Sequence, residues 1–600
     1  MTKVAQAAPY AVLGVPAAYL ADRFVAVAQN AQGATNGAKF TQALQSFPND
    51  LSAHPLAFST STYPILACGG VLLMAGMMYA ARDTNVYRRG EEYGSARWGT
   101  RREMRQFANR KDFSKNIILG RGCYMNMEEG NNPLCARNNN VIVIGGAGAW
   151  KTTSYIMTNL AQMNASFVVT DPKGMTVKRT GKMLEEVGGY KVKVVDFDSL
   201  KNTDHFNPFA YVYDEITLLK VIKVLIDASN GQHGKRGEPF WDKSEEMLLS
   251  ALFAYLYYRY RGDGVIPGDG KLPSLADIGK LIRLLEKNDD LPSVLEIMFD
   301  EFAQKFGREN FAVTQFENMK AYQGQTRASV VAIATARFAM FDLPQVKKFI
   351  ADDTLEMDRW IEEKYAVFLK IPDMGNSFDF LTTMIFLLAF RRLEERVDQE
   401  FQGEAPVPLR FMLDEFANLG VIPNIEEALS VLRSRLISIE LIIQSIHQLE
   451  KNYKEVYKAF FGNCDSVVFL AGSTEPTTQK WISEDAGKQT IYTKERQNRQ
   501  VQYRPMQRDL ITYSEVAILR RTRALVRISS NNYFNIPKYN YKKHPNAKYF
   551  SSSPRDGNWY YFRRYDSPID AWRDNVKKEN SKLVPQSITL AQIEREKLYA

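Results

Sequence analysis

Cysteine and internal repetition are both scarce in this sequence, and each absence excludes a class of protein. The 600 residues contain four cysteines, and no two of them form a C-x-x-C pair. This usage provides neither a disulfide framework nor a zinc site, and it fits a chain whose bulk lies in the reduced cytosol. No low-complexity tract or internal repeat stands out, which argues against a disordered or repeat protein. The scattered cysteines are Cys68, Cys123, Cys135 and Cys464.

A strong excess of charge of either sign is also missing. The formal net charge of +9 is modest for this length, so it permits an anionic partner without arguing for one. The composition is that of an ordinary globular chain, and 600 residues are enough for several domains with a substantial core. The function therefore has to be sought in local motifs.

Two apolar stretches lie near the N-terminus. The second, about residues 63–81, carries no charge, is long enough to cross a bilayer and contains the glycines and methionines that suit a membrane helix. The first, about residues 8–28, is interrupted by Asp22 and Arg23. We interpret it as a second membrane helix whose paired charge faces a neighbour. The alternative is a signal peptide with Lys3 in its basic region.

Cations gather directly after the second apolar stretch, whereas the segment between the two stretches carries only Lys39. The positive-inside rule therefore places everything after Ala81 in the cytoplasm, where ATP is available. The expected location is the inner or cytoplasmic membrane, with the bulk of the chain cytoplasmic. The cations that carry this prediction are Arg82, Arg88, Arg89, Arg97, Arg101 and Arg102.

A run of apolar β-branched residues, 141–144, leads into a loop of small residues and then into Lys151 and Thr152. A buried strand, such a loop and a Lys-Thr pair that opens a helix form the phosphate-binding arrangement G-x-x-x-x-G-K-[ST]. Its backbone N–H groups surround phosphates, its lysine neutralises the charge of the β- and γ-phosphates, and its hydroxyl holds Mg²⁺. We therefore expect ATP and Mg²⁺ as ligands. The expected binding residues are Gly145, Gly146, Ala147, Gly148, Ala149, Trp150, Lys151, Thr152 and Thr153.

Trp150 stands where this pattern has its second glycine. Glycines in such loops let the backbone approach phosphate, and some adopt a positive φ at which a tryptophan is strained. We therefore expect weak ATP binding or poor turnover, and we expect Trp150→Gly to restore activity. The alternative is that the loop tolerates the residue, because its N–H remains and its indole ring can point outward.

Three further strand-like runs end in polar residues, which is where an open parallel sheet binds ligands. Residues 409–413 lead into Asp414 and Glu415, an apolar strand with an acidic pair that is typical of a Walker B motif. Asp414 is expected to bind Mg²⁺ and Glu415 to activate the attacking water. The alternative is a carboxylate pair that caps the next helix.

The other two runs, together with a strand-like run at residues 190–197, predict a doubly wound α/β sheet. Residues 166–170 end at Asp171, which either belongs to the site or forms an ordinary turn, and residues 190–197 follow after a helix. Residues 436–443 end at Gln444, which is placed to sense the γ-phosphate or only to form a hydrogen bond at the strand end.

Arg433 and Arg435 precede the strand that ends at Gln444. One of them could reach the nucleotide of a neighbouring subunit as an arginine finger. Equally, both could belong to an exposed helix end.

With these motifs in this order, the chain resembles the TraG/TraD/VirD-type coupling proteins of conjugative type IV secretion systems. The similarity runs from about Pro9 to Phe550. Met175 departs from it, because the family often has an acidic residue there. Besides the phosphate loop, the segments that carry the resemblance are residues 94–99, 171–174, 206–209, 239–241, 413–420, 433–435 and 461–465.

The resemblance implies an α/β fold, with a RecA-like P-loop ATPase domain, an inserted all-α domain and N-terminal transmembrane helices. It also implies a homo-hexamer at the membrane that receives single-stranded DNA with bound relaxase and passes it to the type IV secretion channel proteins. Residues 239–341 fit the insertion, because they show helical spacing and few strand runs. The expected division is a membrane anchor (1–90), the ATPase domain (91–238 and 342–550), the all-α domain (239–341) and a C-terminal tail (551–600).

Aromatic and basic residues mix near the C-terminus, in residues 539–548 and 559–564. They could stack on DNA bases, but we favour packing, either on the ATPase domain or on a relaxosome protein. Residues 585–600 are expected to form a short amphipathic helix and a partner contact.

The function expected is that of a coupling ATPase. One alternative is a substrate-receptor platform that does not hydrolyse ATP, which Trp150 favours. The other is a DNA translocase outside a secretion system, and residues 94–98 and 414–420 argue against it.

Overall fold

The computed structural model divides the chain into two units, Met1–Glu92 and Tyr93–Ala600, each with its own arrangement of elements. The predictions made for Arg82, Arg88, Arg89 and residues 585–600 fall outside the described residues. The structure describes residues 3–81, 90–128, 135–229, 239–285, 292–322, 324–372, 378–473, 475–497 and 500–562.

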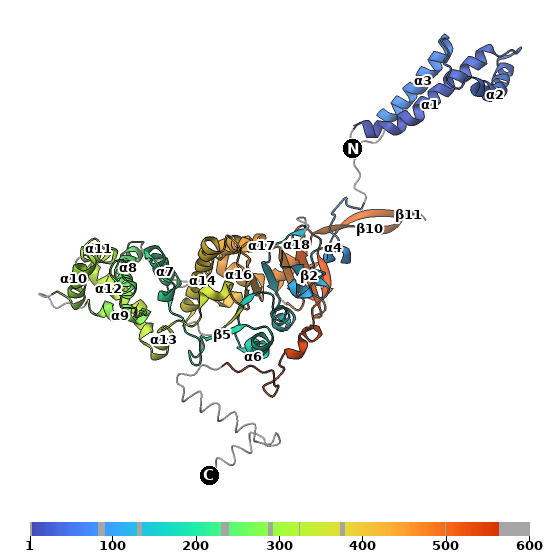
Figure 1. Cartoon of the computed structure of the whole chain (residues 1–600). Helices are drawn as coiled ribbons and strands as arrows, with labels where there is room; N and C mark the ends of the chain where they lie inside the picture. The colour runs from blue at the N-terminus through green and yellow to red at the C-terminus, as the bar shows by residue number, and fades with distance from the viewer. Residues whose placement is uncertain are drawn as a thin grey trace. The chain divides into compact units, whose positions relative to one another are not determined.

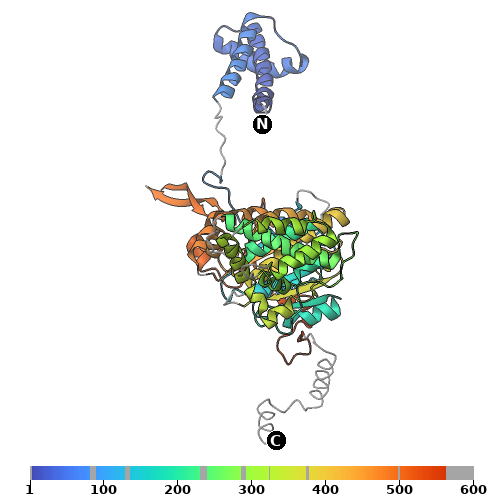
Figure 2. The ribbon, with the colours of Figure 1, turned by 90° about the vertical axis from the view of Figure 1, so that its left-hand side faces the viewer.

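The described part of the first unit forms three helices, α1 (Lys3–Asn30), α2 (Asn36–Ala53) and α3 (Thr62–Ala80). Helices α1 and α3 lie side by side in Figures 1 and 2, and the rings of Tyr10 and Tyr79 meet edge to face at 5.7 Å. Both helices are long and apolar enough to cross a membrane, a test that a signal sequence near the N-terminus also passes.

The charges that interrupt the first apolar stretch face other parts of this unit. Arg23 forms an ion pair with Asp50 of α2. The carboxylate of Asp22 accepts a hydrogen bond from the backbone N–H of Ser59 at 3.0 Å. Both side chains are buried, as the interpretation of a membrane helix with a paired charge requires.

The second unit is built on a nine-stranded sheet, as far as the described residues go, with the strand order β13-β12-β9-β3-β8-β7-β4-β6-β5. The strands from β9 to β5 are parallel, and β12 and β13 extend one edge in antiparallel fashion. The strands are β3 (Val141–Ile144), β4 (Ser166–Thr170), β5 (Lys191–Asp196), β6 (Tyr365–Lys370), β7 (Leu409–Leu413), β8 (Ile437–Ile443), β9 (Ser466–Leu470), β12 (Arg523–Ile528) and β13 (Phe534–Pro537).

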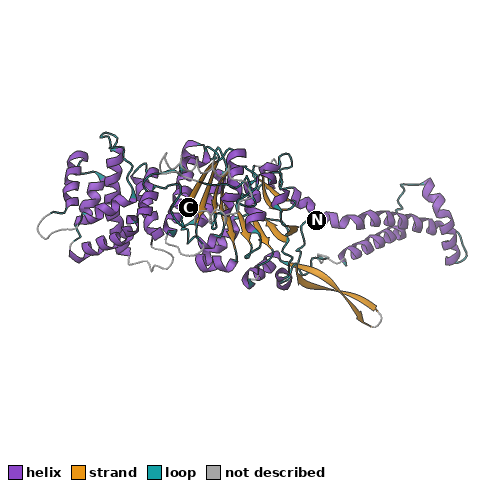
Figure 3. Cartoon of the chain, turned by 90° about the horizontal axis from the view of Figure 1, so that it is seen from below, coloured by secondary structure: helices purple, strands orange, loops and turns teal. Residues whose placement is uncertain are grey.

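The parallel strands form where the sequence has short continuous apolar runs. Every residue of β3, β4, β7, β8 and β9 is buried, because helices cover both faces of the sheet (Figure 3). The flanking helices are η3 (Thr152–Ile156), α5 (Met157–Leu160), α6 (Met175–Lys182), η4 (Met183–Val187), α7 (Glu215–Ser229), α13 (Pro344–Phe349), α14 (Asp379–Glu400), α15 (Ile425–Val431), η9 (Leu432–Arg435), α16 (Ile446–Tyr453), α17 (Tyr457–Asn463), α18 (Pro476–Ala486) and α19 (Tyr513–Ala517).

A helical bundle occupies one end of this unit (Figures 1 and 3). Its aromatic core includes Phe299 and Phe316, whose rings stack at 3.9 Å. A buried ion pair of 2.7 Å between Arg337 and Glu245 ties two of its helices together. The bundle agrees with the expectation of an all-α insertion, whereas the bounds 239–341 stay a prediction. Its helices are α8 (Pro239–Arg261), α9 (Leu275–Arg283), α10 (Val294–Phe306), α11 (Phe311–Lys320) and α12 (Gly324–Phe338).

Two hairpins stand apart from the large sheet. One pairs β1 (Asn116–Gly120) with β2 (Cys123–Asn126), and the other pairs β10 (Lys488–Gln497) with β11 (Gln500–Asp509). The base of the β10–β11 hairpin is fixed by Ala96, whose N–H donates to the carbonyl of Lys488 at 2.9 Å.

The C-terminal segment folds back onto the sheet domain as far as the structure describes it. The N–H of Tyr560 donates to the carbonyl of Lys178 in α6 at 2.9 Å, and the Trp559 side chain is buried. This part of the aromatic and basic tail therefore packs on the protein, as we favoured.

Candidate functional site

The phosphate loop follows β3 at the carboxyl edge of the parallel sheet. The N–H of Gly145 donates to the carbonyl of Ile443 at the end of β8, at 3.0 Å. Gly146 packs so closely that a Cβ there would lie 3.1 Å from Cα of Ser473. Gly148 has a φ of 71°, which glycine adopts without strain. The small residues of the loop are therefore required by its neighbours and its backbone.

The structure brings the lysine of this loop to the acidic pair that follows β7. The ammonium of Lys151 donates to the carbonyl of Gly145 at 2.9 Å and lies 3.1 Å from a carboxylate oxygen of Glu415. The hydroxyl of Thr152 donates to the carboxylate of Asp414 at 3.3 Å. Because the two motifs are 262 residues apart in the chain at this contact, only the folded sheet can bring them together.

Gln444 joins the same cluster from the end of β8. Its side-chain amide donates to the second carboxylate oxygen of Glu415 at 2.8 Å. Glu415 itself has a φ of 52°, and the Asp414 carbonyl accepts a hydrogen bond from the hydroxyl of Thr170 at 2.7 Å. This turn directs both carboxylates to the carboxyl edge of the sheet.

Burial makes Asp414 an electrostatically unfavourable anion. The side chain is 6% exposed, and burial, reinforced by the charge of Glu415, raises its pKa from 3.8 to about 7. Lys151 acts in the opposite direction, without cancelling the shift. A cation bound at Asp414 would therefore stabilise the ionised carboxylate, which the protein alone does not fully compensate.

The oxygen atoms at this point are suited to Mg²⁺. The hydroxyl of Thr152 and the carboxylate of Asp414 are hard oxygen ligands that already lie together. Mg²⁺ is often held by one or two such groups, with phosphate oxygens and water completing its shell. The residues present therefore fit the metal that the sequence predicts.

Asp171, at the end of β4, forms hydrogen bonds with the start of the next helix, α6. Its carboxylate accepts hydrogen bonds from the N–H groups of Met175 at 3.1 Å and Val177 at 2.9 Å, so it caps the start of α6. Asp171 therefore forms the turn that begins α6, and its charge also contributes to the raised pKa of Asp414, so both interpretations of this residue stay predictions.

Trp150 adopts the left-handed backbone that its place in the pattern predicts, with a φ of 63°. Its side chain is 49% exposed, and the ammonium of Lys538 lies 5.2 Å from the centre of its ring. The indole therefore points outward, on the side of the loop where Lys538 lies.

The structure does not bring Arg433 and Arg435 to this cluster. Both lie in η9, before β8 begins, whereas the phosphate loop lies where the parallel strands end. Arg435 is held by an ion pair with Asp398 of α14, which is the first cause of its raised pKa. Arg433 is exposed and forms no ion pair with any residue that the structure describes.

Sequence reasoning missed Lys538, which follows β13. Its ammonium donates to the carbonyls of Ala149 and Ala471, both at 2.8 Å. No local motif marks this lysine, because it reaches the loop only when β12 and β13 extend the sheet.

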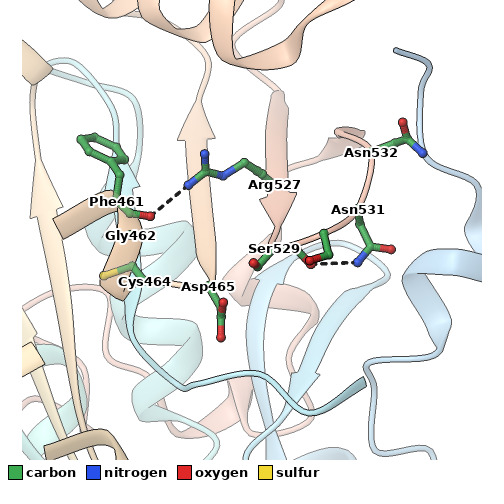
Figure 4. Close-up of a pocket in the computed structure, with 9 residues that line it drawn as sticks. Phe461, Gly462, Cys464, Asp465, Arg527, Ser529, Asn531 and Asn532 are labelled. Atoms are coloured by element: carbon green, nitrogen blue, oxygen red, sulfur yellow. Dashed lines mark hydrogen bonds between the residues drawn. The ribbon is translucent and has the colours of Figure 1, made fainter. Parts of the chain in front are cut away.

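A pocket of about 530 Å³ lies at the amino end of β9, away from the phosphate loop (Figure 4). The family-like segment 461–465 lines it, together with Arg527. The guanidinium of Arg527 donates to the carbonyl of Phe461 at 3.3 Å and forms an ion pair with Asp485 at 2.8 Å. The side chain of Arg527 is therefore held by one contact within the lining and by one contact with Asp485 outside it.

Comparisons with known proteins agree with this arrangement. A family model described as Type IV secretory system Conjugative DNA transfer matches residues 97–563. The chain is 23% identical over 407 residues to the conjugal transfer protein TraG of Escherichia coli, covering 63% of this chain and 61% of that protein. It is 23% identical over 460 residues to the type IV secretion system-coupling protein VirD4 of Bartonella quintana (strain Toulouse), covering 71% and 68%.

Solved structures show the same fold. The plasmid coupling protein TrwB in complex with the ATP analogue ADPNP has a TM-score of 0.53 at 16% identity, over 79% of this chain and 98% of that one. TrwB in complex with ADP and Mg²⁺ has a TM-score of 0.52 at 16% identity, over 76% and 94%. The chain spans between 52% and 63% of the length of three of the curated relatives that it matches.

Proposed function

This chain belongs to the Type IV secretory system Conjugative DNA transfer family, and from this premise we propose that it is a membrane-anchored coupling ATPase. It recruits single-stranded DNA with bound relaxase and drives it into a type IV secretion channel. The observation that carries the proposal is the contact of the phosphate loop with the acidic pair, Lys151 with Glu415 and Thr152 with Asp414.

In the proposed reaction, ATP binds along the loop after β3. Lys151 leaves the carbonyl of Gly145 and the carboxylate of Glu415 and binds the β- and γ-phosphates instead. Thr152 and Asp414 hold Mg²⁺, which when bound neutralises charge on the phosphate oxygens. Glu415, released from Lys151, orients the attacking water and accepts its proton as the water oxygen bonds to the γ-phosphorus and the bond to the β-phosphate breaks. Gln444 holds Glu415 in position and senses the γ-phosphate.

The membrane anchor and the oligomer are part of the proposal. Helices α1 and α3 anchor the chain in the inner or cytoplasmic membrane, and the sheet domain lies in the cytoplasm. Six copies form a ring in which each nucleotide lies between two subunits. Because Arg435 is held by Asp398, Arg433 is the better placed of the two to reach the nucleotide of a neighbouring copy. Alanine at Arg433 should then slow turnover of the assembled ring far more than alanine at Arg435.

Trp150 limits this motor. At a φ of 63° the backbone of a tryptophan is strained by roughly 1 kcal/mol or more. The loop carries this strain as long as it keeps the conformation that binds phosphate. We therefore expect slow turnover, and the runner-up function is a receptor platform that binds its DNA substrate without hydrolysing ATP.

The test measures ATP binding and turnover of the full chain in lipid nanodiscs, with and without single-stranded DNA. Trp150→Gly should increase turnover, and Lys151→Ala should abolish nucleotide binding at the same protein stability. Equal rates for the chain and Trp150→Gly would disprove the impairment. Salt-dependent DNA binding with no turnover in either form would support the receptor platform.

A further inference from the structure

We infer that Lys538 is a positioning residue of the phosphate loop, which holds the Trp150 ring on the outer side and fixes the backbone at Ala149. It does so because a tryptophan occupies a position suited to glycine. The inference rests on the proposed nucleotide site. It adds Lys538 as the residue that holds a loop containing Trp150 in a conformation able to bind nucleotide.

The geometry comes from three contacts of one ammonium group. Lys538 donates to the carbonyl of Ala149 in the loop and to the carbonyl of Ala471 after β9, both at 2.8 Å. Its nitrogen also lies 5.2 Å from the centre of the Trp150 ring, within the range of a cation–π contact. The lysine therefore connects the loop backbone, the loop side chain and the neighbouring strand end.

These contacts matter because the ammonium group of Lys538 is buried away from water. Lys538 is 7% exposed, and no carboxylate among the described residues forms an ion pair with it. A buried ammonium that lacks an anion depends on the groups that surround it, here two carbonyls and an aromatic face. Burial and the nearby charge of Arg521 accordingly lower its pKa from 10.5 to about 8.

The position of the two carbonyls explains what is fixed. Ala149 immediately precedes Trp150, so a hydrogen bond to its carbonyl restrains the peptide unit that sets the φ of 63°. Ala471 precedes Gly472, whose carbonyl lies 3.2 Å from the place of a Cβ on Gly146. Lys538 therefore holds the far end of the loop to the same strand end against which its near end packs.

A first experiment tests the contact without nucleotide. The emission of Trp150 is obtained as the difference between the full chain and Trp150→Phe, and its quenching by acrylamide is measured. Because Trp150 is 49% exposed, its release in Lys538→Met should about double the quenching constant. Lys542→Met, which changes an exposed lysine of the same segment, should leave the constant unchanged. An unchanged constant in Lys538→Met would overturn the inference.

A second experiment measures the affinity for a fluorescent ATP analogue in a double-mutant cycle. Lys538→Met should weaken binding roughly tenfold when residue 150 is tryptophan, as expected for the loss of hydrogen bonds from a charged donor. In the Trp150→Gly background the same change should weaken binding only about twofold, since glycine needs less support. Equal losses in both backgrounds would show a merely structural role and contradict the inference.

If Lys538→Met does not fold, the unmodified chain still provides a test. Raising the pH from 7 to 9 removes the proton of Lys538, so Trp150 quenching should rise with a midpoint near 8. The charged group that acts on Lys538 is Arg521, which stays protonated, and the loop and Ala471 present backbone carbonyls. Lys538→Arg should abolish the pH dependence; a flat profile in the unmodified chain would contradict the inference.

The two proposals can fail separately. If the chain binds no ATP while the nucleotide-free quenching changes as expected, the proposed function fails and the role of Lys538 in the loop stands. If ATP binds but Lys538→Met changes neither quenching nor affinity, the reverse holds.

Discussion

Two clusters of buried charge lie on the same two strands, β7 and β8, and they differ in how completely their groups are paired. Within the strands, Arg410 of β7 and Glu440 in the middle of β8 form an ion pair of 2.6 Å with neither side chain exposed, and the hydroxyl of Tyr155 donates to Glu440 at 2.8 Å. At the strand ends, Asp414 keeps a pKa near 7 although Lys151 is close.

The difference separates a cluster whose carboxylate is compensated inside the protein from one to which we assign ligand binding. The mid-strand carboxylate receives a guanidinium and a phenol, so its charge is compensated inside the protein. The strand-end carboxylates share one ammonium that is also bonded to the Gly145 carbonyl, and Asp414 stays under-compensated. A ligand gains free energy where the protein has left charge unbalanced, which is at the strand ends.

The strongest way to break the comparison is to remove the charge of Glu440. Glu440→Gln leaves Arg410 as an uncompensated buried cation, so we expect a loss of roughly 3–5 kcal/mol in the free energy of unfolding. Urea denaturation followed by circular dichroism measures it. The matched change at the strand ends, Glu415→Gln, should cost much less stability, and equal losses would remove the distinction.

Glu415→Gln should instead act on turnover. If Glu415 accepts the proton of the attacking water, the amide should slow ATP hydrolysis by roughly 100-fold or more, with little change in nucleotide affinity. Single-turnover hydrolysis together with equilibrium binding separates the two effects. A change in affinity as large as the change in turnover would mean that Glu415 acts mainly through its contact with Lys151.

Asp414→Asn sharpens the comparison through pH. The folded pKa of Asp414 lies above the unfolded value, so its ionised form lowers stability above pH 7, and this cost fades as the pH falls toward 4. The variant should therefore unfold at a temperature higher by roughly 2–5 °C at pH 8 in the absence of nucleotide, and by less at pH 5. It should also lose Mg²⁺-dependent binding of ATP. A lower unfolding temperature at pH 8 would contradict the strain that we assign to Asp414.

The smallest expected effect concerns Tyr155. Tyr155→Phe removes one hydrogen bond to Glu440 and leaves the ion pair with Arg410 intact, so the loss should be roughly 1 kcal/mol. Thermal unfolding at matched pH measures it. A loss as large as that of Glu440→Gln would show that the phenol, and not the guanidinium, compensates the carboxylate.

The sequence allowed prediction of the parts of the site that lie at the ends of apolar strands. Residues 141–144, 409–413 and 436–443 are recognisable as strands from their own composition, and a parallel sheet necessarily gathers the residues after such strands at one edge. The left-handed backbone of Trp150 could be expected from the loop pattern, in which a glycine normally stands at that position. Whether Lys151 contacts Glu415 or another carboxylate was outside the reach of any local pattern.

The features that the sequence could not predict depend on contacts between distant segments. Arg410 and Glu440 each interrupt an apolar run. Only the folded sheet brings them together, because the register of β7 against β8 places Arg410 opposite Ser438, two residues from Glu440. The role of Asp171 as a helix cap depends on where α6 begins. Lys538 reaches the loop because β13 is the outer strand of an antiparallel extension, which no composition reveals.

The attachment of Lys538 to a segment made 389 residues earlier also sets an order of events during synthesis. A nascent chain has exposed its phosphate loop and its acidic pair long before β12 and β13 leave the ribosome. Until then the loop lacks the ammonium that we propose restrains it, so the growing chain should bind nucleotide more weakly than the finished one. Chains that terminate before residue 538 would carry every recognisable motif of the site and still lack this restraint on the loop.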